Sequence, residues 1–264
     1  MFAPPPAPRR SSDRRPVDAV LFDFHGTIAQ LENRVNWMVR AAEACGVHLE
    51  RTRAAELADR LDAVGWPVPA QVPAHLVEVF ARRDLSEAAH RAAYTGLAAT
   101  VASGIDGLPD ALYERVLRPD GWVVYADTVP TLRALRAAGI PVAVVSNIGF
   151  DIRPLLAAFG IASLVDAVVL SYEVGLCKPD PAIFQHACGL LGVEPERALM
   201  VGDTPADAGA VSVGCRVLVV PARGPGEVNG LAGALDLARV TGTAAGADTG
   251  ARATGRAIGE RVTG

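Results

Sequence analysis

The sequence predicts an α/β protein, a doubly wound parallel sheet with an inserted α-helical cap domain. Three observations favour this fold class. Short apolar runs recur along the chain and stop at polar or small residues, helical segments separate the later runs, and a long helical stretch follows the first run. Because strands that alternate with helices form parallel sheets with helices on both faces, this order of segments indicates a doubly wound core.

The first apolar run, 17–22, has the composition of a strand that is buried on both faces, and it stops at Asp23. Four later runs are predicted to be strands of the same sheet. They are 141–145 before Ser146 and Asn147, 167–170 before Ser171, 198–201 before Gly202 and Asp203, and 216–220 before Pro221. Ligands bind beyond the carboxyl ends of such strands, so we expect the residues that follow the runs to share one site.

Helical segments between the later runs are marked by residues that start and stop helices. Thr128 is expected to cap a helix that has Pro130 in its first turn and Gly139 just past its end. Two further helices, 151–160 and 180–192, are bracketed by the same kinds of residue. Each helix fits the crossover between two parallel strands.

The stretch 29–124 breaks this alternation and is predicted to be a separate helical cap. Its helical patterns fall at 35–42, 51–64, 76–101 and 109–117. The core is then expected at 17–28 and 125–240. The two ends of the chain, 1–16 and 241–264, are rich in Pro and Arg or in Gly, Ala and Thr, and are predicted to be a disordered arm and a flexible tail.

The composition of the chain excludes several classes of binding partner. The net charge is −4, and no basic run extends beyond the arginines at 9, 10, 14 and 15, so no nucleic-acid partner is expected. No run of about 18 apolar residues is present to span a membrane, and the amino terminus lacks the apolar segment of a secretory signal. The four scattered cysteines form no CxxC pair, which is typical of reduced thiols. We therefore expect a cytoplasmic monomer or homodimer with a small-molecule partner and no membrane association.

Four segments, in order, carry a specific resemblance. They are Leu21–Thr27 (LFDFHGT), Val144–Asn147 (VVSN), Cys177–Phe184 (CKPDPAIF) and Val201–Asp207 (VGDTPAD). Together they resemble the four signature motifs of the haloacid dehalogenase superfamily, whose first motif has the form hhhDxDGT and whose fourth has the form GDxxxD. The resemblance covers about residues 17–221, and the cap is similar only in position and helical character. It implies a phosphatase-like hydrolase with a Rossmann-like core.

The resemblance implies a nucleophile and a Mg²⁺ site at the edge of the sheet. Asp23 is expected to attack phosphorus. Asp23, Asp203 and the main-chain oxygen of His25 are expected to bind the metal, and Asp207 to hold a metal-bound water. Charge supports this assignment, because carboxylates that lie close together raise one another's pKa unless a cation intervenes, and an all-oxygen site suits Mg²⁺. Lys178 is expected to offset the charges of Asp23 and the phosphate.

The remaining motif residues are assigned to the substrate. Ser146 and the backbone N–H groups near Asn147 are expected to hold phosphate oxygens, and Thr27 to orient the nucleophile or the bound phosphate. The implied reaction is hydrolysis of a small phosphorylated metabolite. It consists of in-line displacement by Asp23, an aspartyl-phosphate intermediate, and hydrolysis of that intermediate by water.

His25 departs from the pattern of the first motif. Phosphatases of this superfamily usually have a second aspartate here, which protonates the leaving alcohol and then deprotonates the attacking water. Histidine, with an ordinary pKa near 6.5, can do both. It does not supply the same negative charge, so two interpretations stay open: a working acid-base, and a replacement that has cost the enzyme its usual activity.

Other functions also stay open at this point. Relatives that cleave carbon–halogen bonds replace the second aspartate too, which favours a 2-haloacid dehalogenase-like hydrolase, although metal-free dehalogenation does not need Asp203. Carbon–phosphorus cleavage through a Schiff base needs a lysine in the cap. Lys178 is the only lysine of the chain and lies outside the predicted cap, so this mechanism is not expected. The third alternative is a catalytically weak member of the superfamily that serves as a binding or regulatory protein.

Overall fold

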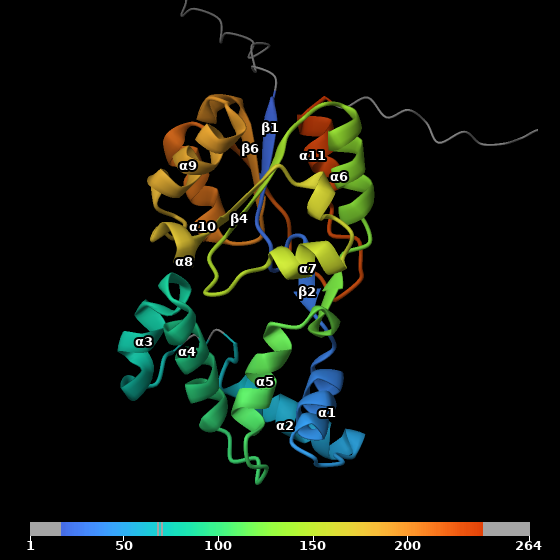
Figure 1. Cartoon of the computed structure of the whole chain (residues 1–264), viewed down its shortest axis with the longest axis vertical. Helices are drawn as coiled ribbons and strands as arrows, with labels where there is room; N and C mark the ends of the chain where they lie inside the picture. Colours follow the sequence, from blue (N-terminus) through green and yellow to red (C-terminus); the bar gives the residue numbers. More distant parts are fainter. Residues whose placement is uncertain (1–16, 68, 70, 240–264) are drawn as a thin grey trace, which may run out of the picture.

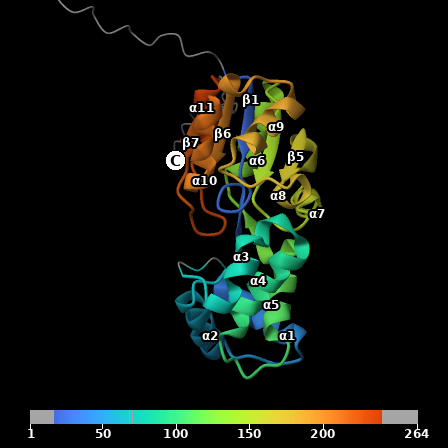
Figure 2. The ribbon, with the colours of Figure 1, turned by 90° about the vertical axis from the view of Figure 1, so that its left-hand side faces the viewer.

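The computed structural model describes residues 17–67, 69 and 71–239 of the chain. The predicted arm, 1–16, and the predicted tail, 241–264, lie outside the described residues. A sheet with its flanking helices occupies the upper half of the molecule in Figure 1, and a group of helices lies below it. The view turned by 90° in Figure 2 shows the same division.

The upper half is built on a five-stranded parallel sheet with the order β5-β4-β1-β6-β7. The strands are β1 (Ala19–Phe22), β4 (Val142–Ser146), β5 (Ala167–Leu170), β6 (Ala198–Gly202) and β7 (Arg216–Val219). Each strand coincides with or overlaps one of the predicted apolar runs. The three inner strands are buried at every residue, which explains why their sequences are apolar without alternation. The predicted fold class is confirmed.

Helices cover both faces of the sheet (Figure 1). On one side lie α6 (Thr128–Ala137) and α11 (Ala232–Leu237), and on the other lie α9 (Pro181–Leu191) and α10 (Pro205–Ala208). Phe22 of β1 belongs to the apolar cluster that contains Leu132 of α6, whereas Leu21 belongs to the cluster that contains Phe184 of α9. Successive side chains of one strand therefore fill two different cores.

The start of α6 corrects one expectation. Thr128 is the first residue of the helix, and Asp127, not Thr128, occupies the N-cap position. The hydroxyl of Thr128 donates to the main-chain oxygen of Ile28 at 2.8 Å, a partner that local spacing does not reveal. The carboxylate of Asp127 accepts hydrogen bonds from the backbone N–H groups of residues 229–231. These contacts tie the start of α6 to the loop after β1 and to the segment before α11.

The lower half consists of helices that the chain forms between β1 and β4. They are α1 (Arg34–Ala44), α2 (Arg51–Ala63), α3 (Val77–Ala81), α4 (Glu87–Ala99) and α5 (Leu108–Val116). The segment 76–101 is divided by a short 3₁₀ helix, η2 (Arg83–Leu85), and by the extended residue Ser86. The Ser86 hydroxyl accepts from the backbone N–H of Ala89 and so caps α4. The limits 29–124 for the cap stay a prediction.

Two short strands that the sequence analysis did not predict join the cap to the core. They are β2 (Ala29–Leu31) and β3 (Trp122–Val124), an antiparallel pair with Gln30 opposite Val123. Only the first residue of each strand is buried, so neither strand leaves an apolar run in the sequence. The chain therefore enters and leaves the cap through one ribbon.

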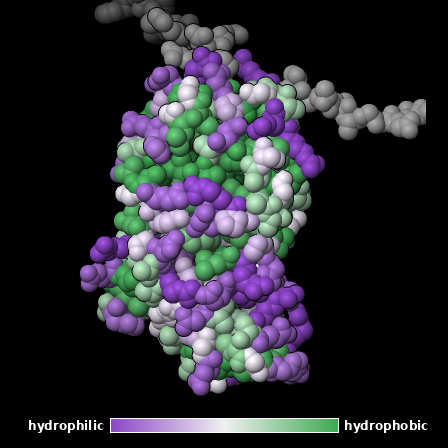
Figure 3. Space-filling view, viewed as in Figure 1, coloured by the Kyte–Doolittle hydropathy of each residue, from purple (hydrophilic) through white to green (hydrophobic). Residues whose placement is uncertain are grey.

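The other elements are short helices. They are α7 (Arg153–Ala158), α8 (Ser171–Val174), η1 (Ala74–Leu76), η3 (Pro119–Gly121), η4 (Ala162–Leu164), η5 (Pro195–Arg197) and η6 (Gly209–Val213). Hydrophilic residues form a band across the middle of the face drawn in Figure 3. Among the helices of the described ranges, none combines the length and the hydropathy that crossing a bilayer requires.

Candidate active site

Three carboxylates meet at the carboxyl edge of the sheet. Asp23 follows β1, Asp203 follows the neighbouring strand β6, and Asp207 lies in α10. One ligand oxygen from each of the three lies within 4.8 Å of the others. Asp23 and Asp207 are buried and Asp203 is partly exposed. The parallel pairing of β1 with β6 thus brings together the three aspartates that the sequence analysis assigned to a metal.

The ammonium group of Lys178 lies between two of these carboxylates. Its Nζ donates to Asp23 Oδ1 at 2.7 Å and to Asp207 Oδ1 at 2.6 Å. Although burial favours the neutral amine, the charges of Asp23 and Asp207 raise the pKa of Lys178. Lys178 is therefore a buried cation that is fixed within the carboxylate cluster.

Two neighbours hold the lysine and its carboxylates in place. The side chain of Asn147 donates to the main-chain oxygen of Lys178 at 2.8 Å and accepts from its N–H at 2.7 Å. Asp207 Oδ2 accepts from the N–H and the hydroxyl of Thr204, at 3.0 and 2.6 Å, in the capping box that begins α10. The side-chain amide of Asn147 and both oxygens of Asp207 thus have partners within the protein.

The loop after β1 brings backbone directly against Asp203. Gly26 has a φ of +83°, and a Cβ atom on it would lie 2.3 Å from Asp203 Oδ2, so this position requires glycine. The hydroxyl of Thr27 donates to Asp203 Oδ1 at 3.5 Å. The Asn229 amide donates to the main-chain oxygens of Gly26 and Thr27 at 2.9 and 3.1 Å. Asn229 was missed because it lies outside the four motifs.

The cluster carries more negative charge than its one lysine offsets. Burial raises the pKa of Asp23 against the attraction of Lys178. Burial, together with the charges of Asp23 and Asp207, raises the pKa of Asp203 to about 7. A divalent cation would complete the charge balance, and a set of carboxylate oxygens fits a hard cation such as Mg²⁺. The residues present therefore fit the metal that the sequence analysis implied.

The ring of His25 lies beside the cluster and is oriented by Gln30. His25 Nε2 is 2.7 Å from Gln30 Oε1, an oxygen that also accepts from the N–H of Leu31 at 2.9 Å. Because this oxygen is an acceptor, we assign the proton to Nε2, which leaves Nδ1 unprotonated in the neutral ring. Burial lowers the pKa of His25, against the effects of Gln30 and Asp23.

A cavity of about 520 Å³ opens over these residues. The core lines it with residues that the sequence analysis assigned to the site: Asp23, His25, Ser146, Asn147, Lys178 and Asp203. Thr27 and Asp207 are buried and do not line it. The cap contributes Arg83, Asp84 and Tyr94, which belong to none of the four motifs. The site is therefore assembled from both halves of the molecule.

The arrangement of nucleophile candidate, lysine and acidic cluster agrees with a comparison of the whole sequence. The family model of the haloacid dehalogenase-like hydrolases matches residues 17–212, which is more than half of the chain. This chain belongs to the haloacid dehalogenase-like hydrolases. The matched range includes β1, the cap, the strand that ends in Ser146, and the strand that precedes Asp203.

Known members of the family match shorter parts of this hydrolase. It is 37% identical over 103 residues to the haloacid dehalogenase-like hydrolase domain-containing protein 3 of Mus musculus. This match covers 39% of this chain and 41% of that protein. It is 42% identical over 80 residues to the glyceraldehyde 3-phosphate phosphatase of Methanopyrus kandleri, which covers 30% and 34%. The hydrolase thus spans well under half the length of these relatives.

Two solved structures share the fold over most of their length. A phosphatase of the family from Thermococcus onnurineus has a TM-score of 0.52 at 27% identity and covers 84% of this chain and 97% of its own. A dehalogenase has a TM-score of 0.58 at 24% identity and covers 84% and 96%. The second likeness supports the fold alone.

Mg²⁺ is expected to stabilise the hydrolase more at about pH 8 than at about pH 5.5. Folding raises the pKa of Asp203 to about 7, so its contribution to stability is present below its ordinary pKa and is lost as the pH rises through 7. A bound divalent cation reverses this loss, because it competes with the proton for the same carboxylate. Melting temperatures with Mg²⁺ and with EDTA at both pH values measure the effect. Equal shifts at the two pH values, or an undiminished shift in Asp203→Asn, would contradict it.

The cap rests directly on the core at Gly149, in the loop after β4. A Cβ atom on Gly149 would lie 2.3 Å from the Cβ of His90 in α4 and 2.7 Å from the main-chain oxygen of Arg83. His90 is buried, is stacked on Tyr94 at 4.2 Å between centroids, and meets Phe150 of the core edge-on at 5.5 Å. The cap is therefore packed over the site with no room for a further methyl group at this point.

Gly149→Ala is expected to lower kcat/KM by about tenfold or more, because the added methyl holds the cap and its cavity residues away from the core. Steady-state kinetics checks this, with small-angle scattering as a readout of cap position. Gly189→Ala is the matched control, since nothing lies within 4 Å of a Cβ atom there. An unchanged kcat/KM in Gly149→Ala would show that the contact has no part in the working enzyme.

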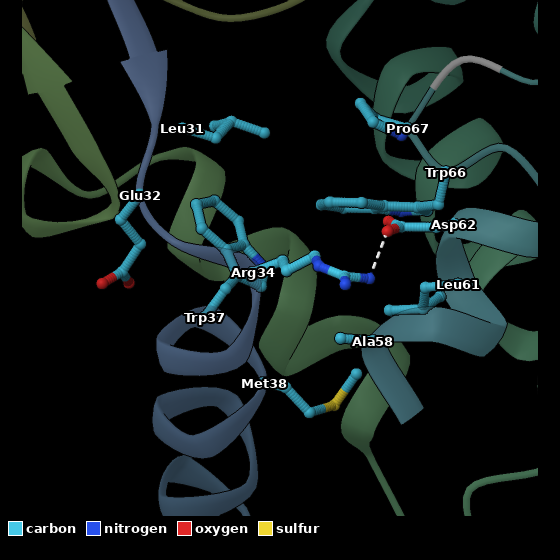
Figure 4. Close-up of a pocket in the computed structure, with 10 residues that line it drawn as sticks. All are labelled: Leu31, Glu32, Arg34, Trp37, Met38, Ala58, Leu61, Asp62, Trp66 and Pro67. Carbon is cyan, nitrogen blue, oxygen red and sulfur yellow. Dashed lines mark hydrogen bonds and ion pairs between the residues drawn. The ribbon is translucent and has the colours of Figure 1, made fainter. Parts of the chain in front are cut away.

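A second cavity, of about 130 Å³, lies inside the cap (Figure 4). The indoles of Trp37 and Trp66 border it, with ring centroids 5.8 Å apart. Arg34 reaches across it and pairs with Asp62, as the dashed line in Figure 4 shows, and also with Asp59. None of the residues assigned to the active site lines this cavity. We assign these contacts to packing within the cap.

Proposed function

We propose that this hydrolase cleaves phosphate monoesters of small molecules, with Asp23 as the nucleophile and Mg²⁺ as the cofactor. The observation that carries the proposal is the position of Lys178, whose ammonium joins Asp23 to Asp207 at the floor of an open cavity. A buried cation at a carboxylate nucleophile suits attack on an anionic substrate. The names of relatives agree, since both the Methanopyrus and the Thermococcus proteins are phosphatases.

The reaction proceeds in two displacements at phosphorus. A carboxylate oxygen of Asp23 forms a bond to phosphorus while the bond from phosphorus to the alcohol oxygen breaks. A water then attacks phosphorus, the bond to Asp23 breaks, and inorganic phosphate is released. Lys178 offsets the charges of Asp23 and the phosphate in both steps, and Ser146, buried at the end of β4, donates to a phosphate oxygen.

Residues around the nucleophile would hold the metal. Asp23, Asp203 and the main-chain oxygen of His25 would bind Mg²⁺, and Asp207 would hold one of its waters. When bound, Mg²⁺ supplies positive charge that offsets the charge of the phosphate. Asn147 and Thr204 position Lys178 and Asp207 through the hydrogen bonds described above.

His25 serves as the group that transfers protons in both steps. The hydrogen bond from Nε2 to Gln30 fixes the ring beside Asp23 and leaves Nδ1 as the nitrogen that exchanges a proton with the alcohol or the water.

Asp23→Asn and His25→Ala are therefore expected to change turnover in different ways. The first lowers turnover of both kinds of ester by about 10⁴-fold or more, whereas the second slows alkyl phosphates by about 10²-fold and p-nitrophenyl phosphate far less, because p-nitrophenolate leaves without a proton.

Hydrolysis of p-nitrophenyl phosphate with Mg²⁺ and with EDTA tests the proposal. We expect turnover that requires the metal and disappears in Asp23→Asn. Release of halide from a 2-haloacid without metal would instead identify a dehalogenase, the alternative that His25 favours. The absence of turnover on a broad panel of phosphate esters would identify a binding or regulatory protein.

A further inference from the structure

The cap places two opposite charges side by side in the wall of the active-site cavity. Arg83 and Asp84 are consecutive residues of η2, and both line the cavity that contains Asp23 and Lys178. Their side chains are only 28% and 13% exposed, so both charges are largely removed from water. Tyr94 of α4 is the third cap residue in this lining. A substrate whose phosphate lies at Asp23 presents its alcohol portion to a wall that includes this pair.

The ion pair between the two residues leaves much of their hydrogen-bonding capacity unused. Arg83 Nη2 lies 3.2 Å from Asp84 Oδ2, and Arg83 Nη1 donates to the main-chain oxygen of Phe80 at 3.2 Å. Arg83 Nε is buried and has no partner within the part of the chain that the structure describes. The contact is an ion pair through one nitrogen and one oxygen, not the two-pronged pairing in which a guanidinium and a carboxylate satisfy each other.

The pair is held in place by the core. Ser171 Oγ donates to the main-chain oxygen of Asp84 at 2.5 Å, and the main-chain oxygen of Arg83 is packed against Gly149. Figure 2 shows this part of the cap directly below α8, the helix that begins with Ser171. The two charges therefore have a fixed position relative to Asp23 whenever the cap is packed as described.

Opposite charges that are adjacent and desolvated favour a ligand with the complementary pair of charges. A leaving group with a carboxylate alone is attracted by Arg83 but repelled by the negative charge of Asp84. A leaving group with an amine alone is attracted by Asp84 but repelled by Arg83. A neutral polyol makes hydrogen bonds to both but does not compensate either buried charge. A group that carries both charges satisfies each side chain.

We propose that Arg83 and Asp84 select phosphate esters whose alcohol portion is zwitterionic, with Arg83 binding a carboxylate and Asp84 binding an adjacent protonated amine. The proposal rests on the proposed phosphatase activity and names its substrate class. Burial raises the pKa of Asp84 to about 6 against the attraction of Arg83 and Lys178, so its carboxylate is charged at neutral pH. A protonated amine bound beside it stabilises this charge. The neutral phenol of Tyr94 adds a hydrogen-bonding group beside the pair.

A panel of five esters tests the proposal with the 264-residue chain and Mg²⁺. O-phospho-L-serine has both charges, 2-phosphoglycolate only the carboxylate, O-phosphoethanolamine only the amine, glucose 6-phosphate neither, and p-nitrophenyl phosphate reports the basal reaction. We expect kcat/KM for O-phospho-L-serine to exceed the values for the three other metabolites by about tenfold or more. A higher kcat/KM for 2-phosphoglycolate, O-phosphoethanolamine or glucose 6-phosphate would overturn the proposal.

Variants of Arg83 and Asp84 test whether these two residues cause the preference for the zwitterionic ester. Arg83→Ala and Asp84→Asn are each expected to raise KM for O-phospho-L-serine and to remove its advantage of about tenfold in kcat/KM over glucose 6-phosphate. Arg82→Ala is the matched control, because Arg82 is exposed and does not line this cavity. A selectivity that survives both variants would overturn the proposal, and Arg83→Lys replaces Arg83→Ala if the alanine variant does not fold.

The outcomes separate this proposal from the proposed function. If the wild-type protein does not hydrolyse p-nitrophenyl phosphate with Mg²⁺, the phosphatase proposal fails. If it does, and the panel shows no preference for the zwitterionic ester, only the assignment of Arg83 and Asp84 fails.

Discussion

Asp23→Asn is expected to lower kcat for p-nitrophenyl phosphate by about 10⁴-fold to 10⁶-fold while the protein stays folded. The amide is not a nucleophile, so the first displacement at phosphorus cannot occur. Folding is expected to persist because burial raises the pKa of Asp23, which means that the fold disfavours the charge that the substitution removes. Lys178 keeps its contact with Asp207. Steady-state kinetics and a thermal melt measure the two effects.

Asp18→Asn is the matched control for this experiment. Asp18 directly precedes β1, at the opposite end from Asp23, and pairs with Arg197 at the surface. Exposed ion pairs contribute about 0 to 1 kcal/mol, so this variant should retain its activity. An Asp23→Asn protein that retains a tenth or more of its activity would show that another group attacks phosphorus.

Lys178→Met is expected to lower kcat by about 10²-fold to 10³-fold and to reduce the free energy of unfolding by about 3 to 5 kcal/mol at neutral pH. The substitution removes the only cation at hydrogen-bond distance from Asp23 and Asp207 among the described residues, and leaves two buried carboxylates without it. Loss of Lys178 raises the pKa of Asp23 further above its ordinary value. The destabilisation should therefore be largest above this raised pKa and shrink as the pH falls through it, because protonation removes the charge of Asp23.

Urea denaturation at several pH values measures this stability. Arg153→Met is the matched control, because Arg153 also pairs with two carboxylates, those of Asp151 and Glu173, but at the surface. Its loss should cost about 1 kcal/mol or less. Equal losses of stability in the two variants, or full activity in Lys178→Met, would contradict the role assigned to the buried lysine.

The sequence predicted the sheet and the carboxylate cluster because both follow from local patterns. A strand buried on both faces is apolar at each residue, and the residue after it, such as Asp23 or Asp203, lies at one edge of a parallel sheet. The first motif has glycine at position 26 because the backbone there lies so close to Asp203 that a side chain would not fit. These features depend on a few adjacent residues, so they can be read from the chain.

Contacts between distant or unmarked segments could not be predicted in this way. Asn229 supports the loop at Gly26 from 203 residues away, and Arg83 and Asp84 reach the cavity only because the cap folds over the core. The ribbon formed by β2 and β3 is too short and too exposed to leave a pattern. The assignment of Thr128 as a helix cap was wrong because its hydroxyl bonds to Ile28, 100 residues earlier.

Rapid acid quench of the hydrolase during turnover of p-nitrophenyl phosphate with Mg²⁺, followed by peptide mass spectrometry, tests the formation of a covalent intermediate on Asp23. The account predicts that the peptide containing Asp23 gains the mass of one phosphoryl group, that hydroxylamine removes it, and that Asp23→Asn never acquires it. A phosphoryl group on a different residue, or unmodified Asp23 in an enzyme that is turning over, would contradict it.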